Sequence, residues 1–89
     1  MGEANMLSKG YGPGTICKGI LEVLNDTYPQ PAQFGYIAAQ LKERCKKVFS
    51  DTTIVAGLAA LLERKEILGK VMEDKIEYEI THTGQDRLR

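Results

Sequence analysis

The chain has 89 residues, of which 43 % are hydrophobic and 27 % are charged, and its twelve basic and twelve acidic side chains give a formal net charge of zero. A chain of this length forms one small domain, and no apolar run approaches the roughly 20 residues that a membrane-spanning helix needs. The N-terminal sequence MGEANMLSKG lacks the apolar segment of a secretory signal. We therefore expect a cytoplasmic protein without a membrane partner.

The charges are distributed unevenly along the chain. Residues 1–50 carry six basic and four acidic side chains, and residues 51–89 carry six basic and eight acidic ones. A zero net charge gives no general attraction to nucleic acid, so an anion-binding face is expected mainly in the first half. Without an export signal, Cys17 and Cys45 are expected to be free thiols.

The first residues differ in composition from the rest. Residues 1–14 hold four glycines and one proline. Glycine-rich segments lose much conformational entropy when they become ordered. We expect a flexible N-terminal arm over residues 1–14, followed by a folded domain over residues 15–89.

The first predicted helix covers residues 15–25, TICKGILEVLN. Thr15 is a suitable N-cap, and the prolines and turn formers after Asn25 and Asp26 end the pattern. The apolar residues at helical spacing are Ile16, Ile20, Val23 and Leu24.

A second helix is predicted over residues 32–47, with Pro31 in its first turn. One side of this helix is apolar, which predicts that it packs against the core. The apolar stripe consists of Phe34, Ile37, Ala38, Leu41, Cys45 and Val48.

A third helix is predicted over residues 50–66, capped by Ser50 or Asp51. Its two sides differ in character, and the leucine-rich side should face the core. The core side holds Ile54, Leu58, Leu61 and Leu62, and the outward side holds Thr52, Thr53, Ala56, Ala60 and Glu63.

The hydrophobic period changes to two after the third helix. Residues 69–73 and 75–81 are expected to form two strands joined at residues 73–75, with Gly69 ending the helix before them. The tail, HTGQDRLR, begins one more turn or short helix with Leu88 as its apolar anchor.

Three helices followed by a hairpin resemble the winged helix-turn-helix domain. The stretches FGYIAAQL, SDTTIVAGLAALLERKEILG and YEITHTGQDRL resemble segments of PadR- and MarR-type transcriptional regulators. The resemblance implies an α+β fold: a three-helix core, a two-stranded β-hairpin wing and a short C-terminal helix or turn. It also implies that Thr81 and Gly84 shape the turn after the wing.

The resemblance further implies a small DNA-binding transcriptional regulator. The third helix would lie in the major groove of double-stranded DNA, and two copies would form a homodimer on two half-sites. The dimer surface would be either the first helix with the arm or the C-terminal tail.

The candidate DNA-binding residues fall into three groups. Small side chains on the third helix would meet bases or phosphate, and basic side chains at the end of the second helix would hold the backbone. The alternative for the second group is a solvated helix end whose charges suit the helix dipole. The candidates are Ser50, Thr52, Thr53 and Ala56 on the third helix; Lys42, Arg44, Lys46 and Lys47 near the end of the second; and Lys70 and Lys75 on the wing.

Other features argue against tight DNA binding. The exposed first three turns of the third helix contain no Arg or Lys, and the hairpin is acidic, so binding should be modest and salt-sensitive. The alternative function is a winged-helix protein–protein interaction module. An apolar surface for it would consist of Val55, Ala56, Ala59 and Ala60.

Nothing in the sequence predicts an enzyme. His82 is the single histidine, no Cys/His spacing forms a zinc site, and the glycine-rich start lacks the end of a phosphate-binding loop. We expect no catalytic residue, no metal, no cofactor and no small-molecule substrate.

Overall fold

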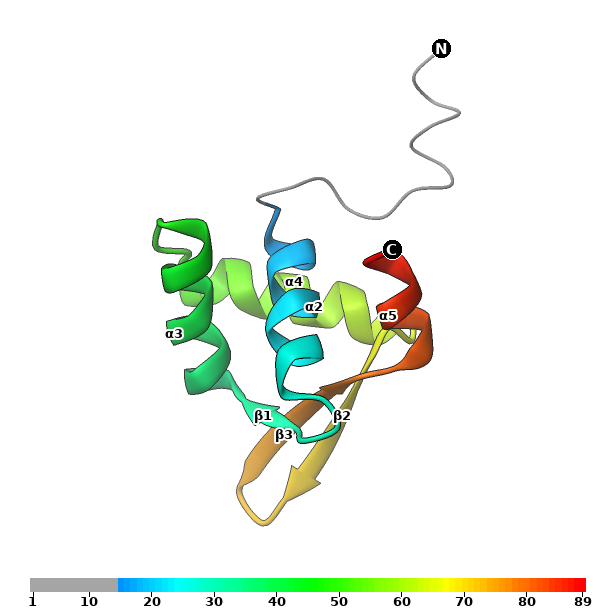
Figure 1. Cartoon of the computed structure of the whole chain (residues 1–89). Helices are drawn as coiled ribbons and strands as arrows, with labels where there is room; N and C mark the ends of the chain where they lie inside the picture. Colours follow the sequence, from blue (N-terminus) through cyan, green and yellow to red (C-terminus); the bar gives the residue numbers. More distant parts are fainter. Residues whose placement is uncertain (1–14) are drawn as a thin grey trace.

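The computed structural model describes residues 15–89, so the predicted arm over residues 1–14 lies outside the described residues. The described elements form an α+β arrangement of helices and one antiparallel sheet with strand order β1-β3-β2 (Figure 1). In chain order they are α2 (Ile16–Thr27), β1 (Ala32–Gln33), α3 (Phe34–Cys45), α4 (Asp51–Glu63), β2 (Ile67–Met72), β3 (Lys75–Ile80) and α5 (His82–Arg87).

Helix α2 is the central element of the fold. The Thr15 hydroxyl oxygen accepts a hydrogen bond from the Lys18 amide at 3.3 Å, which confirms the predicted N-cap. The helix runs to Thr27, slightly beyond the predicted end, and packs against α3, α4, β3 and α5. Its fully buried side chains are Ile20, Leu21, Val23 and Leu24.

Helix α3 is shorter at both ends than predicted. Ala32 pairs with Tyr78 in β3, so this segment is an extended third strand and Pro31 precedes a strand rather than opening a helix. At the other end, Lys46 adopts a left-handed conformation with φ of 56°, which stops the helix at Cys45. Val48 is therefore outside the apolar stripe, and its side chain is 75 % exposed.

Helix α4 also ends earlier than predicted. The chain reverses at Lys65, which has φ of 65°, and the amides of Lys65 and Glu66 bond to the last carbonyls of the helix. These bonds satisfy the helix end without a glycine. Gly69 lies inside β2, so the prediction that it ends the helix is wrong.

The predicted faces of α4 are confirmed except at Leu62 and at Ala60, which was predicted on the outward side and is half-buried. Ile54, Leu58 and Leu61 are buried in the core. Leu62, predicted on the same side, has 37 % of its surface exposed because it lies toward the wing side of the helix. The leucine spacing alone did not distinguish a core position from a border position.

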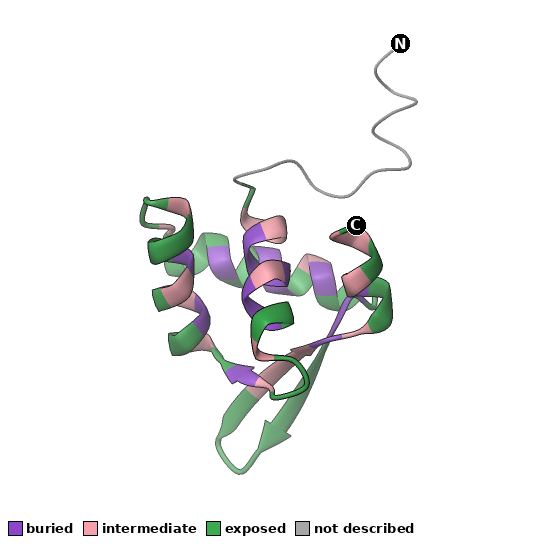
Figure 2. Cartoon of the chain, in the orientation of Figure 1, coloured by how far each residue is buried: buried purple, intermediate pink, exposed green. Residues whose placement is uncertain are grey.

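Strands β2 and β3 form the predicted hairpin, although β2 begins at Ile67 instead of Gly69. Directly paired residues point to the same side of a sheet. Ile67 pairs with Ile80 and both are buried, whereas Val71 pairs with Ile76 and both are exposed. The outer half of the hairpin accordingly projects away from the helices (Figures 1 and 2).

Helix α5 is fixed to the turn between α4 and β2. The Thr81 hydroxyl donates to the Lys65 carbonyl at 2.8 Å and accepts from the Gly84 amide at 3.1 Å. A Cβ atom on Gly84 would lie 2.2 Å from the Glu66 carbonyl oxygen, so only glycine fits there without a shift. The predicted roles of Thr81 and Gly84 in this turn are confirmed, and half-buried Leu88 packs against the core as predicted.

An ion pair that the sequence pattern did not predict closes the same junction. Glu66 is only 3 % exposed, and its carboxylate oxygen Oε2 lies 2.9 Å from Nε of Arg87. A buried carboxylate requires such a partner. The pair therefore links the base of the wing to α5.

Candidate nucleic-acid interface

The outward side of α4 exposes small polar and apolar groups. Thr52, Thr53 and Ala56 are all exposed, while the buried residues of the helix lie on the opposite side (Figure 2). Short side chains allow a helix to approach a groove or another surface closely. Threonine and alanine methyl groups can contact the methyl group of thymine, and hydroxyl groups can contact bases or phosphate.

The first turn of α4 is capped by its own hydroxyl groups. The Ser50 hydroxyl oxygen accepts from the Thr53 amide at 3.1 Å, and the two hydroxyl oxygens lie 2.9 Å apart. Asp51 adds a carboxylate to this turn, which suits the helix dipole but repels phosphate. A phosphate contact here depends on cations nearby.

Three of the predicted phosphate-binding lysines are brought together just before this turn in the chain. Lys42, Lys46 and Lys47 line a shallow hollow of about 290 Å³ at the end of α3 and the start of the following loop, together with Glu43 and Val48. We call Lys42, Lys46 and Lys47 the lysine corner. It lies next in the chain to the exposed start of α4, as a groove-binding helix with a flanking phosphate contact requires.

Lys47 has an aromatic neighbour. Its ammonium nitrogen lies 4.9 Å from the centroid of the Phe49 ring. A cation at this distance is attracted to the face of the ring. The contact orients Lys47 toward Phe49, which precedes the start of α4.

Arg44 is not part of the lysine corner. Its guanidinium forms an ion pair with Asp26 of α2, and so ties α3 to α2. A phosphate contact by Arg44 would have to compete with this carboxylate.

The two wing lysines lie among acidic neighbours. Lys70 lies 3.5 Å from a carboxylate oxygen of Glu79, and Lys75 directly follows the wing turn formed by Glu73 and Asp74. Phosphate is repelled by these carboxylates more than it is attracted by two lysines. The wing adds little attraction for DNA.

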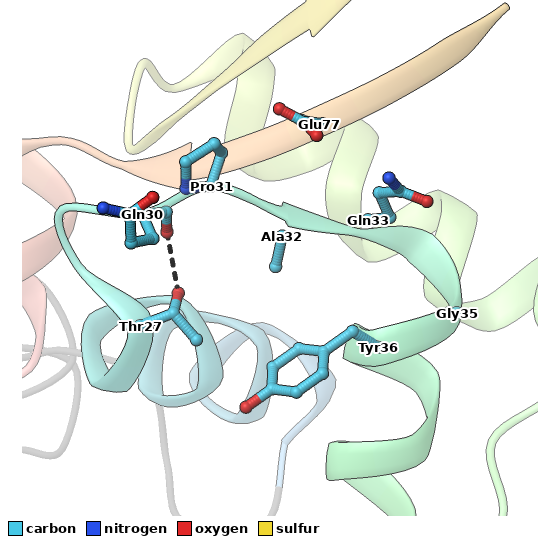
Figure 3. A pocket seen from close by; sticks show the side chains of 8 residues that line it. All are labelled: Thr27, Gln30, Pro31, Ala32, Gln33, Gly35, Tyr36 and Glu77. Atoms are coloured by element: carbon cyan, nitrogen blue, oxygen red, sulfur yellow. Dashed lines mark hydrogen bonds between the residues drawn. The ribbon is translucent and has the colours of Figure 1, made fainter.

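A second hollow lies under β1, between the end of α2 and the start of α3, and encloses about 560 Å³ (Figure 3). None of the ten predicted DNA-binding residues lines it. The Thr27 hydroxyl is already engaged there, because it donates to the Gln30 carbonyl at 3.0 Å. The lining residues are Thr27, Gln30, Pro31, Ala32, Gln33, Gly35, Tyr36 and Glu77.

The groups capable of chemistry are dispersed. Across residues 15–89 there is no cluster of three or more potential metal ligands, and no helix in this range has the length and apolar character needed to cross a membrane. Both cysteines are free. Burial raises the pKa of the Cys17 thiol, which disfavours the nucleophilic thiolate.

Comparisons with known proteins agree with this architecture. No protein-family model matches the chain, and no curated protein does. A PadR family transcription regulator from hypervirulent Clostridium difficile R20291 superimposes with a TM-score of 0.71, at 22 % identity over 82 % of this chain and 78 % of that one.

Two further solved structures are also similar. F93 from STIV, a winged-helix DNA-binding protein, gives a TM-score of 0.69 at 17 % identity, over 80 % of this chain and 76 % of that one. The circadian clock associated protein Pex from Anabaena gives a TM-score of 0.58 at 21 % identity, over 85 % of this chain and 72 % of that one. The predicted winged-helix fold is thus confirmed, with a sheet of three strands instead of two.

Proposed function

We propose that this chain is a small DNA-binding transcriptional regulator that places α4 in the major groove. The single observation that carries the proposal is the lysine corner, which directly precedes the exposed Thr/Ala side of α4 in the chain. In this arrangement Thr52, Thr53 and Ala56 face bases, and Ser50 lies at the phosphate backbone. The winged-helix neighbours, one of them described as DNA-binding and one as a transcription regulator, support it.

The binding strength follows from the charges. Three lysines at the corner supply the attraction, and the acidic wing opposes it. We therefore propose weak binding by one copy, with affinity falling steeply as salt rises. Two copies on two half-sites would supply the remaining affinity, through contacts of α2 or α5. The proposal includes a cytoplasmic location and no small-molecule substrate.

An interaction module without DNA binding is the second candidate. The exposed Val55 side chain, 55 % accessible, favours it, because an exposed aliphatic group on α4 has little to gain from a phosphate backbone. The acidic wing favours it too. In this alternative, α4 packs on a helix or strand of another protein.

A gel-shift experiment with random-sequence duplex DNA tests the proposal. The unmodified chain should retard DNA at roughly 20 mM salt and release it by roughly 200 mM salt. The double substitution Lys46→Glu and Lys47→Glu should abolish retention, because it replaces two attractive charges with two repulsive ones. Its melting temperature should stay near that of the parent, since both side chains are exposed.

The matched control carries the same change in net charge elsewhere. Arg64→Glu with Lys65→Glu alters two exposed residues after α4, outside the lysine corner, the wing and the proposed dimer surfaces, and should reduce retention far less. Equal loss in both variants would point to net charge alone. Retention that survives the substitution of Lys46 and Lys47, or none at low salt, would favour the interaction module.

A further inference from the structure

A continuous apolar strip crosses the surface between α4 and the wing. On α4 it consists of Val55, Ala59 and Leu62, which are all exposed and recur at positions i, i+4 and i+7, so they share one side of the helix. Leu62 lies at the wing end of this row. Its side chain would be 3.6 Å from a Cβ atom built on Gly69 of β2.

The wing continues the strip beyond Gly69. The same Cβ position lies 3.7 Å from the Tyr78 ring and 3.8 Å from Ile76. Ile76 pairs with Val71, so both point to this side of the sheet, and their side chains are 46 % and 76 % exposed. Gly69 forms a notch between larger side chains.

The two ends of the strip carry opposite charges. The end at the start of α4 adjoins the lysine corner, and the other end is the wing turn with Glu73 and Asp74. Other charges are present at both ends: Glu43 beside the lysines and Asp51 in the first turn of α4 at one end, and Lys75 after the wing turn at the other. Basic side chains still outnumber acidic ones at the first end, and acidic side chains outnumber basic ones at the second.

We propose that this strip, from Val55 to Val71, is a docking surface for a second copy of this chain, with the two strips antiparallel about a twofold axis. In that orientation the lysine corner of each copy meets the wing turn of the other, which makes the two ends complementary. A parallel arrangement would put like charges together. The acidic wing turn also reaches the positive end of the opposing α4.

Side-chain size complements the charges. In the antiparallel pair the large Val71 and Ile76 side chains of one wing lie over Ala59, the small residue of the strip on the opposing α4. A small residue on a helix allows such an approach without a clash. Leu62 lies near the axis, next to Gly69 of its own chain.

The pairing uses the surface that the proposed DNA complex uses. A second copy and a DNA duplex therefore compete for α4, and pairing belongs to the protein without DNA. The inference does not rest on DNA binding, because it concerns the apolar strip and the charges of the protein alone.

Sedimentation velocity of residues 1–89 tests the pairing, over about 10 µM to about 1 mM, the range expected for an interface smaller than the standard size. The unmodified chain should show a monomer–dimer equilibrium. Val71→Ser with Ile76→Ser should raise the dimer Kd about tenfold or more, because the apolar area buried in the pair is lost. Far-UV circular dichroism checks that this variant is folded.

The strand itself supplies a matched control. Leu68 and Met72 lie on the opposite side of the same hairpin and are similarly exposed, at 47 % and 50 %. Leu68→Ser with Met72→Ser should leave the Kd within about twofold, as for surface positions outside an interface. A larger effect in the control than in the test variant would overturn the proposed side of the wing.

A charge exchange tests the antiparallel orientation. Lys46→Glu with Lys47→Glu, and separately Glu73→Lys with Asp74→Lys, should each weaken self-association about tenfold, since both junctions become repulsive. A mixture of the two variants should pair again, because opposite charges then meet at both junctions. A chain that stays monomeric at 1 mM, or variants that fail to pair when mixed, would overturn the proposal.

The same variants separate this inference from DNA binding. Glu73→Lys with Asp74→Lys should strengthen DNA retention while it weakens self-association. If this variant retains no DNA but pairs with its complement, the proposed function fails and the pairing stands. If the variant retains DNA more strongly but does not pair with its complement, the proposed pairing fails and the proposed function stands.

Discussion

The wing hairpin has a base and a tip that are built from the same two strands. At the base, Ile67 and Ile80 face each other and are 1 % and 2 % exposed, whereas at the tip Val71 and Ile76 face each other on the same side and are largely exposed. The base is further joined to α5 by the Thr81 hydrogen bonds and the ion pair of Glu66. The tip has none of these contacts.

The same alternation of aliphatic and polar residues therefore has two roles in the hairpin, one at the base and another at the tip. Aliphatic residues at the base stabilise the fold, because they leave water when the chain folds. Those at the tip remain in contact with water, so they contribute little to folding and are available to a partner. Substitutions at the two ends of the hairpin should therefore have effects on stability that differ several-fold.

The largest effect is expected at Ile80. Ile80→Asp would place a carboxylate in the core, where removing an isoleucine to alanine already costs about 2–5 kcal/mol and an unpaired charge costs more. Domains of this kind are stable by about 5–15 kcal/mol, so the variant should be largely unfolded. Urea titration followed by circular dichroism measures the loss.

Ile76→Asp is the matched control at the tip, on the same strand and the same side. Its side chain is exposed, so the substitution should cost about 1 kcal/mol, the span of strand propensities. A cooperative transition for Ile80→Asp close to that of Ile76→Asp would contradict the contrast between base and tip.

A smaller loss is expected where α5 meets the base. Gly84→Ala would bring a Cβ atom within 2.2 Å of the Glu66 carbonyl oxygen, which is backbone and cannot rotate away. We expect a loss of about 1–3 kcal/mol, as for overpacked cores, even though alanine favours helices. Thermal denaturation measures it.

Gly35→Ala in α3 supplies the comparison for this glycine. A Cβ atom at Gly35 meets nothing within 4 Å, so only the gain in helix propensity remains, about 0.5 kcal/mol near a helix end. The two alanine substitutions should shift the melting temperature in opposite directions. Shifts of the same sign would show that Gly84 is not tightly enclosed.

The sequence predicted the strands but not the division between base and tip. Alternation at Ile76, Tyr78 and Ile80 is the same whether or not a helix covers the sheet, so burial at each position depends on α5 and α4. The junction between the base of the wing and α5 was not predicted, for a similar reason. The sequence pattern indicates a solvated charge for Glu66, at the end of a predicted helix. Its partner Arg87 lies 21 residues further along the chain, so the pair has no local signal.

The candidate interface was predictable in part. Helical spacing correctly placed Thr52, Thr53 and Ala56 opposite the core. The lysine run at the end of the second helix gave no sign that Arg44 pairs with Asp26 while Lys42, Lys46 and Lys47 line one hollow, because that depends on where α2 packs. Gly69 was misassigned because a glycine is the usual helix stop, and here Lys65 takes the left-handed conformation instead.

The smallest effect is expected at the tip, and with the opposite sign. Glu73 in the wing turn has φ of 57°, a conformation that costs a non-glycine residue about 1 kcal/mol. Glu73→Gly should stabilise the domain by about 0.5 kcal/mol, less than the strain released, because glycine also gains entropy in the unfolded chain. Asp74→Gly removes the same charge at the next residue, which has no positive φ. This substitution should destabilise the domain by a similar amount. Thermal melts of both variants, at concentrations too low for self-association, should therefore shift in opposite directions. Equal shifts in melting temperature would mean that the lost charge, and not the backbone strain at Glu73, determines how these substitutions change stability.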